Sequence, residues 1–446
     1  MKTLKKLLYF LTPREKKSAV ILLIMIIIMA FVDMIGVASI LPFMAVITNP
    51  SLIETNFLLK NLFQISSVIG VETNKEFTFF LGSLVFLLLI ISLSFKAITI
   101  YTQTRFVQMR GYSIGKKLLE TYLNQPYAWF LNQNSAYLGK TILSEANLIT
   151  GQGLTPIFNL ITYCIITISL LILLLLVDVK LTLIVFLVIG SLYFIIFSLF
   201  KKSLDHIGKE RLITNGLRFK WISEAFGASK EIKLGGLEKI YVDRFSKPSL
   251  IFARNESRSV MINSLPRYFI EALSFGGILL IILYTISKMG NFTNSIPIIS
   301  IYAFAGYRLM PSLQQIYQAA TVIKYSSPTI NKIYDELRGL EANNSIQNEN
   351  ILSFNKSIKL NKISYSYPNS KKTALKDIDL TIPAKTKVGF IGLTGCGKTT
   401  TIDIILGLLE PQKGTLEIDG EVINNNNRRS WQRSIGYVPQ HIYLAD

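Results

Sequence analysis

Long apolar segments alternate with polar and basic segments along most of the chain. Six are long enough to cross a membrane, at roughly 18–41, 77–101, 156–177, 179–200, 268–288 and 296–318. A helix needs about 20 apolar residues to span the hydrocarbon core of a bilayer. Only a short turn around Asp178 and Lys180 separates the third segment from the fourth, which predicts a helical hairpin. The pattern predicts a multi-pass α-helical membrane domain with six spans.

The pattern changes after the last apolar segment. Residues 341–357 are polar and rich in asparagine, which is typical of a linker. The elements predicted next are strands at 357–368 and 374–382, a buried strand at 387–392, an apolar helix at 399–409 and a hairpin at 414–423 with an Asp419-Gly420 turn. We therefore divide the chain into a membrane domain (1–338), a linker (339–356) and part of an α/β domain (357–446).

Charge predicts how the membrane domain is oriented. The N-terminus and the connections 102–155 and 201–267 are rich in lysine and arginine, whereas the other connections hold few basic residues. By the positive-inside rule, these three segments lie in the cytoplasm. Six spans then return the chain to the cytoplasm, where the α/β domain follows. The connections 102–155 and 201–267 are long and partly amphipathic, so we expect the spans to continue as helices beyond the membrane.

The composition agrees with a membrane protein. Of the 446 residues, 50% are hydrophobic, and the formal net charge is +19. A basic balance can indicate nucleic acid, anionic lipid or cytoplasmic loops. Because the basic residues alternate with long apolar runs, we expect a membrane partner and no nucleic acid. The two cysteines, Cys164 and Cys396, predict no disulfide framework, and the first apolar run has no small-residue cleavage site, so we interpret it as a retained anchor.

The stretch IGLTGCGKTT (391–400) is a phosphate-binding motif. Gly392, Gly397, Lys398 and Thr399 match G-x-x-x-x-G-K-[ST]. The glycines let successive N–H groups point at phosphate oxygens, and the helix that begins at Lys398 adds its positive N-terminal end. Lys398 can reach the β- and γ-phosphates, and the Thr399 hydroxyl can ligate Mg²⁺. The predicted strand before the motif and helix after it strengthen this assignment.

Two residues flank the motif. Tyr367 lies upstream in SYSYP, where an exposed aromatic ring can stack on adenine; the alternative is a tyrosine of the protein core. Gln440 lies downstream in GYVPQ, where a glutamine can contact Mg²⁺ and the attacking water; the alternative is a solvated loop residue.

Together these features resemble an ATP-binding cassette exporter half-transporter over the whole chain. The resemblance implies ATP and Mg²⁺ as cofactors, ATP hydrolysis coupled to transport, and a homodimer formed through both domains. It makes Thr399 and Gln440 the magnesium ligands and Gln440 the Q-loop sensor. The nucleotide-binding residues that it implies are Tyr367, Gly392, Leu393, Thr394, Gly395, Cys396, Gly397, Lys398, Thr399 and Thr400.

Within that family, three stretches are most similar to lipid-linked oligosaccharide flippases. They are YRLMPS (307–312), LPRYFIEAL (265–273) and GLTGCGKTTTIDIILGLL (392–409). This resemblance implies flipping of a polyprenyl-diphosphate-linked sugar across the bacterial inner membrane. A lipid A, peptide or drug exporter is the alternative within the class, and a non-transporting nucleotide-binding membrane regulator is the alternative from another class.

The chain departs from the family pattern after Gln440. An LSGGQ-type signature, an apolar strand that ends in Asp-Glu and a switch histidine do not follow, and His441 stands too early to be that histidine. We therefore interpret the sequence as a fragment of a longer protein, one that lacks catalytic residues and is inactive by itself.

Three cations lie within or beside the predicted spans, where ionisable groups are costly. Lys96 lies in span two, Arg267 at the start of span five and Arg308 in span six. They can line a cavity for a diphosphate. Alternatively, Lys96 snorkels, Arg267 pairs with Glu271 and Arg308 caps the pore mouth.

Three further stretches predict short helices. NQPYAWF (124–130) and RFKWISEAF (218–226) are aromatic stretches in the basic connections, either packed between helices or forming transverse helices that dock on the cytoplasmic domain. In the outer connection, Leu58, Leu62, Ile65 and Ile69 share one face of a predicted helix. That helix either contacts lipid or simply connects two spans.

Overall fold

The computed structural model describes residues 2–68, 70–177, 179–288, 296–340, 351–368, 370 and 372–439. The chain divides into two units. The first comprises Met1–Lys116 with Gly139–Asp335, and the second comprises Lys117–Leu138 with Glu336–Asp446. A piece of the first basic connection therefore belongs to the unit that carries the phosphate loop.

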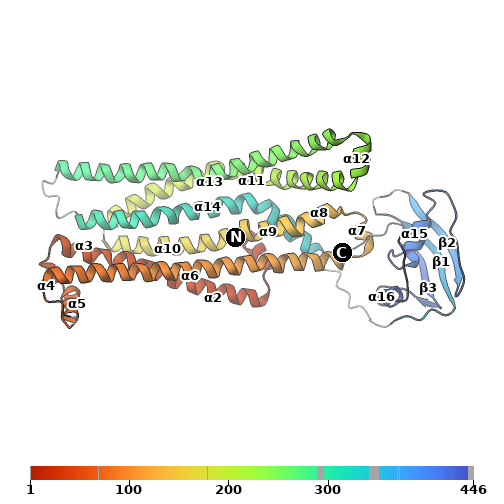
Figure 1. Cartoon of the computed structure of the whole chain (residues 1–446), viewed down its shortest axis with the longest axis horizontal. Coiled ribbons are helices and arrows are strands. Elements are labelled where there is room, and N and C mark those ends of the chain that lie inside the picture. The colour runs from red at the N-terminus through yellow and green to blue at the C-terminus, as the bar shows by residue number, and fades with distance from the viewer. Residues whose placement is uncertain are drawn as a thin grey trace. The chain divides into compact units, whose positions relative to one another are not determined.

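The first unit consists of helices, and its long helices run side by side (Figure 1). In chain order the elements are α1 (Lys2–Tyr9), α2 (Pro13–Ala38), α3 (Ile40–Thr48), α4 (Leu52–Thr55), α5 (Phe57–Ser67), α6 (Asn74–Leu123), α8 (Ser135–Lys140), η1 (Thr141–Glu145), α9 (Ala146–Leu148), η2 (Ile149–Leu154), α10 (Thr155–Val177), α11 (Val179–Gly227), α12 (Ser229–Gly235), α13 (Glu238–Lys288) and α14 (Ile296–Leu340). Helix α6 continues into the second unit, where α7 (Tyr127–Phe130) follows; α8 begins and α14 ends in that unit as well.

The start of α2 follows directly from its sequence. Pro13 occupies the first turn, and the Thr12 hydroxyl accepts a hydrogen bond from the Glu15 N–H. The Glu15 carboxylate in turn accepts one from the Thr12 N–H at 2.8 Å. This reciprocal cap pairs two N–H groups that a helix start leaves without partners.

The prediction of long helices is confirmed. Helix α6 has 50 residues, and α13 has 51. At 1.5 Å per residue, such helices are about 75 Å long, more than twice the thickness of a hydrocarbon core of about 30 Å.

Three predicted spans coincide with helical stretches that are apolar and long enough to cross a membrane. Within the described residues these stretches are Pro13–Ile47, Asn74–Leu123 and Ser135–Leu176. The other three predicted spans lie in α11, α13 and α14. The number six stays a prediction, and the turn residue Asp178 lies outside the described residues.

The predicted outer helix is present as α5, and the face that it buries covers only part of the predicted apolar face; Ile69 lies outside the described residues. Leu59 is buried in a cluster with Phe77 and Leu81, and Leu62 packs against the same cluster. Ile65, predicted on the apolar face, is 62% exposed. The face is set by packing on α6 rather than by periodicity alone.

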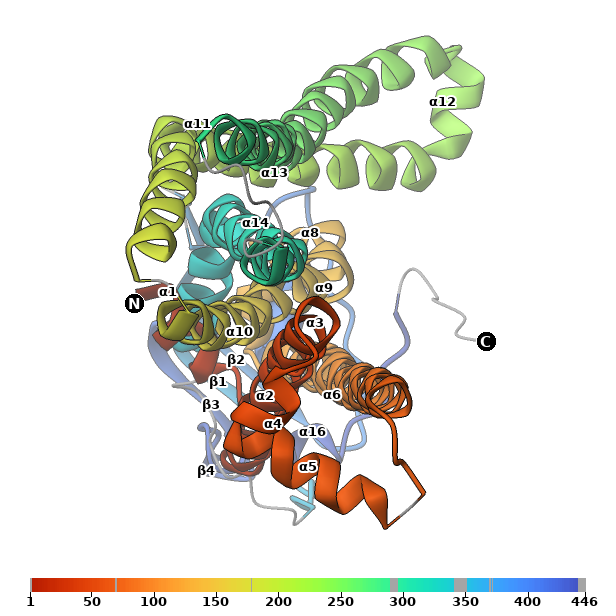
Figure 2. The same ribbon diagram turned by 90° about the vertical axis from the view of Figure 1, so that its left-hand side faces the viewer.

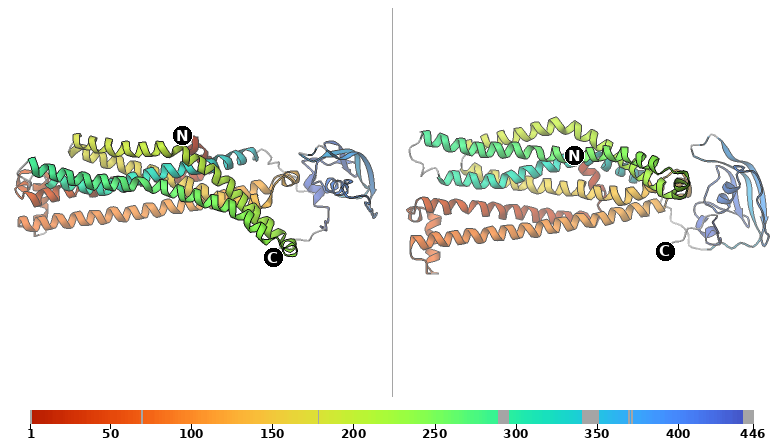
Figure 3. Two further views of the ribbon diagram at one scale, coloured as in Figure 1. Left: turned by 90° about the horizontal axis from the view of Figure 1, so that it is seen from above. Right: turned by 45° about the horizontal axis from the view of Figure 1, so that its top comes forward.

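The two aromatic stretches have different structures. Residues 127–130 form the short helix α7, as the transverse-helix interpretation expects. Residues 218–226 instead continue α11, and the short helix is α12, which joins α11 to α13 (Figures 2 and 3). Helix α11 runs through these aromatic residues and ends at Gly227. The Arg244 guanidinium of α13 lies 5.0 Å from the Trp221 ring.

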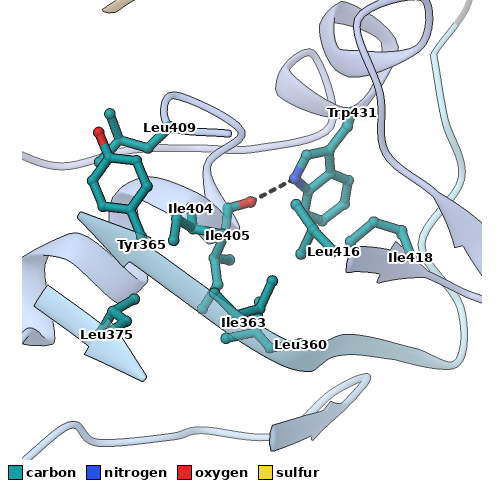
Figure 4. Close-up of a cluster of buried hydrophobic side chains, with 10 residues drawn as sticks. All are labelled: Leu360, Ile363, Tyr365, Leu375, Ile404, Ile405, Leu409, Leu416, Ile418 and Trp431. Carbon is teal, nitrogen blue, oxygen red and sulfur yellow. Dashed lines mark hydrogen bonds between the residues drawn. The ribbon is translucent and has the colours of Figure 1, made fainter. Parts of the chain in front are cut away.

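The second unit contains an antiparallel sheet with the strand order β2-β1-β3-β4. The strands are β1 (Ser357–Ser366), β2 (Thr373–Pro383), β3 (Lys413–Ile418) and β4 (Glu421–Val422). Leu360 in β1 lies opposite Leu380 in β2 and Leu416 in β3. Helices α15 (Lys398–Ile405) and α16 (Arg428–Gln432) pack on this sheet around a buried cluster. In it the Trp431 indole donates a 2.7 Å hydrogen bond to the Ile405 carbonyl (Figure 4).

The Asp419-Gly420 hairpin is confirmed between β3 and β4. Both residues have left-handed backbones, with φ of 55° and 90°. The Asp419 carboxylate also accepts hydrogen bonds from the N–H groups of Asn355, Lys356 and Ser357 at 2.6–2.8 Å. These hydrogen bonds hold the pKa of Asp419 below its ordinary value.

The buried strand predicted at 387–392 is wrong. This segment forms no strand, Ile391 is 99% exposed and Val388 is 48% exposed. A strand needs a hydrogen-bonded neighbour, and no strand among the described residues pairs with this segment. Its apolar composition predicted burial, but burial depends on a partner that the composition does not supply.

Candidate nucleotide-binding site

The phosphate loop connects the end of the β2 region to α15. Gly395 and Gly397 both have left-handed backbones, with φ of 84° and 96°. A Cβ atom on Gly397 would lie 2.6 Å from the Leu375 side chain and 2.9 Å from the Ala374 carbonyl oxygen. Glycine is therefore required at 397 both for its conformation and for the close approach of β2.

Lys398 folds back across the loop. Its ammonium group donates hydrogen bonds to the carbonyl oxygens of Gly392 at 2.8 Å and Leu393 at 2.9 Å. The Cys396 sulfur lies 3.7 Å from the same nitrogen. The cation is thus held within the curve of the loop, at the positive N-terminal end of α15.

The threonines after Lys398 face different surroundings. Thr399 is exposed, so its hydroxyl is open to solvent at the start of α15. Thr400 is buried, at 5% exposure, and its Oγ1 lies 2.9 Å from the Tyr367 hydroxyl. The Thr401 hydroxyl donates to the Gly397 carbonyl at 3.0 Å. The structure therefore brings Tyr367 against the helix that carries the loop.

Tyr367 combines both surroundings considered for it. Its ring packs edge-to-face on Tyr365, with centroids 5.2 Å apart, and it borders the buried cluster. It is only half-buried, so part of the ring remains open beside the loop.

Helix α7 contributes residues that the sequence did not single out as part of this site. Ala128 packs against the buried cluster of the second unit. Burial raises the pKa of Tyr127, and the nearby Asp403, Tyr367 and Tyr437 raise it further. Burial also raises the pKa of Asp403. The sequence held one signal for Asp403, because it is a lone acidic residue within the apolar stretch IDIILGLL (402–409).

The loop residues suit a triphosphate with Mg²⁺. Loop N–H groups, a helix N-terminus and Lys398 together form a cradle for anions. Mg²⁺ keeps several waters and takes only one or two protein ligands beside phosphate oxygens, so the Thr399 hydroxyl is an adequate donor. Within the described part of the chain, no cluster of three or more His, Cys, Asp or Glu residues is built for a metal. Gln440 lies outside the described residues.

The candidate cargo residues lie far along the chain from the loop, on three different helices of the first unit. Lys96 is half-buried on α6. Arg267 on α13 forms an ion pair with Glu271 at 2.7 Å, the pairing considered as its alternative role. Arg308 belongs to α14, but its side chain is outside the described part of the structure.

The structure also shows a buried acidic residue in the first unit, Asp33, which the sequence analysis did not single out. Asp33 is 2% exposed within the predicted first span, and it accepts a 3.0 Å hydrogen bond from Ser92 on α6. Ser92 lies one helical turn before Lys96 on that helix. An acid inside an apolar run is itself a signal, because such residues are rarely retained without a role.

A chain that carries both a nucleotide-binding loop and a bundle of long apolar helices is typical of a membrane transporter driven by a nucleotide. The family model described as "ABC transporter transmembrane region" matches residues 20–312, more than half of the chain, and the model described as "ABC transporter" matches residues 375–446. The chain therefore belongs to the ABC transporter family.

Several known proteins are similar over part of the chain. The glutathione/L-cysteine transport system ATP-binding/permease protein CydC of Bacillus subtilis is 31% identical over 173 residues, which are 35% of this chain and 30% of CydC. An ATP-dependent lipid A-core flippase of Methylobacillus flagellatus is 24% identical over 244 residues, 53% of this chain and 40% of that protein. The matched regions thus span less than half of either relative.

A solved structure has the same fold. It is the structure of a bacterial Atm1-family ABC exporter with ATP bound, which superposes with a TM-score of 0.68. The match covers 95% of this chain and 71% of that one, at 14% sequence identity.

Proposed function

We propose that the full-length protein is an ATP-driven exporter that hydrolyses ATP and works as a homodimer. The observation that carries the proposal is the geometry of Lys398, held within a glycine loop at the start of α15 in a chain of the ABC transporter family. In a motor of this class, transfer of the γ-phosphoryl group of ATP to water supplies the energy.

Each residue of the proposed nucleotide site has a separate role. The N–H groups of the loop and the Lys398 ammonium neutralise the phosphates, while Thr399, with Gln440, holds Mg²⁺. Tyr367 stacks on adenine, and its hydroxyl contact with Thr400 sets the ring against the loop. Tyr127 on α7 lies beside Tyr367 and Asp403, so α7 can respond to the nucleotide.

The cargo that we propose is a polyprenyl-diphosphate-linked oligosaccharide, flipped across the bacterial inner membrane. Lys96, Arg267 and Arg308 would hold the diphosphate. The N-terminus and the nucleotide-binding domain lie in the cytoplasm in this scheme, as the distribution of basic residues favours. Because Arg267 is already paired with Glu271, the proposal depends most on Lys96 and Arg308.

A lipid A-type glycolipid is the second candidate cargo. Lipid A-core flippases from two bacteria match about half of the chain, at 24% and 26% identity. Both candidates share a phosphorylated head group on a lipid, so the same cations suit either one.

The proposal is tested with the full-length protein in proteoliposomes. We expect ATP-dependent flipping of a fluorescent polyprenyl-diphosphate-linked oligosaccharide, and slower flipping of labelled lipid A. Faster lipid A flipping would favour the second cargo. ATP hydrolysis without flipping of either lipid would contradict the cargo assignment while leaving the motor intact.

A further inference from the structure

Two π-helical stretches interrupt the segment that leads into α10. They are η1 (Thr141–Glu145) and η2 (Ile149–Leu154), separated only by α9 (Ala146–Leu148). Such stretches are uncommon and occur often at functional positions. The Ser326 hydroxyl on α14 donates a 2.7 Å hydrogen bond to the Gln152 carbonyl in η2. The segment is therefore held by side chains of other helices as well as by its own backbone.

An ion pair lies fully buried at the start of this segment. The Lys140 ammonium is 3.2 Å from the Glu145 carboxylate, and each side chain is 2% exposed. Burial lowers the pKa of Lys140, and Glu145 opposes that shift. Charges this deep are costly unless they are compensated.

Glu145 also reaches α11. The Asn215 side chain donates to the Glu145 carboxylate at 3.0 Å, and the Arg211 guanidinium lies 3.6 Å from its other oxygen. Arg211 is 8% exposed. Arg211 and Asn215 are one turn apart on α11, and both contact the Glu145 carboxylate. This carboxylate therefore links α11 to η1.

The same contacts extend to two more helices. Arg211 donates a 3.0 Å hydrogen bond to Glu256 on α13, and Tyr325 on α14 donates to Glu256 at 2.9 Å. We call Lys140, Glu145, Arg211, Glu256 and Tyr325 the Glu145 junction. It joins α8 and η1 on one side to α11, α13 and α14 on the other.

The chemistry of the junction suits a contact that opens. Helices α11, α13 and α14 meet through buried apolar side chains, including Leu204, Ile207 and Ile262. Separating such surfaces would expose them to water. The contacts of Glu145 with α11 are instead charged or polar, and each separated charge would regain hydration. Separating Glu145 from α11 therefore costs less free energy than separating α11, α13 and α14 from one another.

We propose that the Glu145 junction is a separable ionic contact between η1 and the α11–α13 pair, and that its opening and closing is a conformational step of transport. The second half rests on the proposed function, whereas the first half stands on geometry alone. Glu145 acts as a positioning residue, because it touches neither nucleotide nor cargo.

Electron–electron double resonance, which measures the distance between two spin labels, tests this inference. The labels are placed on exposed positions on either side of the junction, at Leu143→Cys (72% exposed) and Ile213→Cys (65% exposed). Cys164 and Cys396 are replaced by serine so that only the two new cysteines are labelled. Distances are recorded in nanodiscs, with Glu145→Gln and Arg211→Gln as the test variants. Glu224→Gln, which removes a carboxylate from a surface pair on α11, is the control.

We expect both test variants to enlarge the long-distance population at least threefold, with Glu224→Gln unchanged. If Arg211→Gln does not fold, Arg211→Lys, which keeps the charge, replaces it as the test variant. It should enlarge the long-distance population by a smaller factor. An unchanged distribution in Glu145→Gln and in the Arg211 variant would overturn the junction. The role in transport would be overturned if MgATP, shown by fluorescence to bind, left the distribution of the parent protein unchanged. Absence of nucleotide binding in the protein that keeps Cys396 would instead contradict the proposed function, so binding is measured with and without Cys396→Ser.

Discussion

The Tyr367 hydroxyl lies 2.9 Å from Oγ1 of Thr400, in the first turn of the helix that follows the phosphate loop. This contact ties a side chain that follows β1 to α15, 33 residues later in the chain. Because Thr400 is buried and directly follows Thr399, the position of the Tyr367 ring and that of the Thr399 hydroxyl, which we propose to bind magnesium, are set together.

Tyr367 variants should separate the ring from its hydroxyl. Tyr367→Ala removes the stacking surface, and stacking on a base is worth about 1–3 kcal/mol, so we expect a roughly 5- to 150-fold loss of ATP affinity. Tyr367→Phe keeps the ring and loses only a neutral hydrogen bond, which is worth about 0.5–1.5 kcal/mol, so the loss should be about 2- to 10-fold. Titration of a fluorescent ATP analogue against the 446-residue chain measures both. Equal affinities for Tyr367→Ala and the parent would exclude the stacking role.

Lys398→Ala should weaken ATP binding more than any neutral change in the loop. The side chain supplies the cation of the cradle, and a hydrogen bond to a charged group is worth about 1.5–3 kcal/mol, or one to two decades in affinity. Because the contacts of this ammonium with described residues are to atoms of the loop, the sheet should remain folded. Lys413→Ala, an exposed lysine in β3, is the matched control. Parent-like binding by Lys398→Ala would remove this loop from the site.

Much of this site could be predicted from the order of residues, because a phosphate loop is a local structure. The glycine spacing, the start of α15 at Lys398 and the Asp419-Gly420 turn depend on neighbours in the chain. The segment 387–392 was predicted wrongly because a strand depends on a distant partner. Asp33 and the Glu145 junction were not found, because each pairs residues from helices that lie far apart in the sequence.

Asp419 should stabilise the start of the second unit in a pH-dependent manner. Its folded pKa lies below the ordinary value of 3.8, so its contribution is present above that value and is lost as pH falls through the lowered pKa. At pH 7, Asp419→Asn should speed hydrogen exchange at the N–H groups of residues 355–357 several-fold relative to the parent. The ratio should approach one as pH falls further below 3.8. A ratio that is constant across this range would contradict a role for the charge.

The cargo variants should differ from one another because their charges are compensated differently. Arg267 is already paired with Glu271, so Arg267→Ala should change flipping per ATP hydrolysed only modestly, about threefold or less. Lys96→Ala and Arg308→Ala should each reduce it by about one to two decades if these cations contact the diphosphate. Hydrolysis itself should persist, since neither residue belongs to the phosphate loop.

Arg308→Lys distinguishes a cargo ligand from a structural residue. Lysine still supplies a point charge but not the bidentate fork of arginine, so a ligand role predicts partial recovery of flipping over Arg308→Ala at equal amounts of folded protein. A structural role predicts less folded protein in Arg308→Ala, with normal flipping by the molecules that fold. The measurement is flipping of a labelled lipid-linked oligosaccharide in proteoliposomes, divided by the ATPase rate. If this ratio is unchanged in both Arg308→Ala and Lys96→Ala, these cations do not form an anion site, and the cargo must be recognised by other residues.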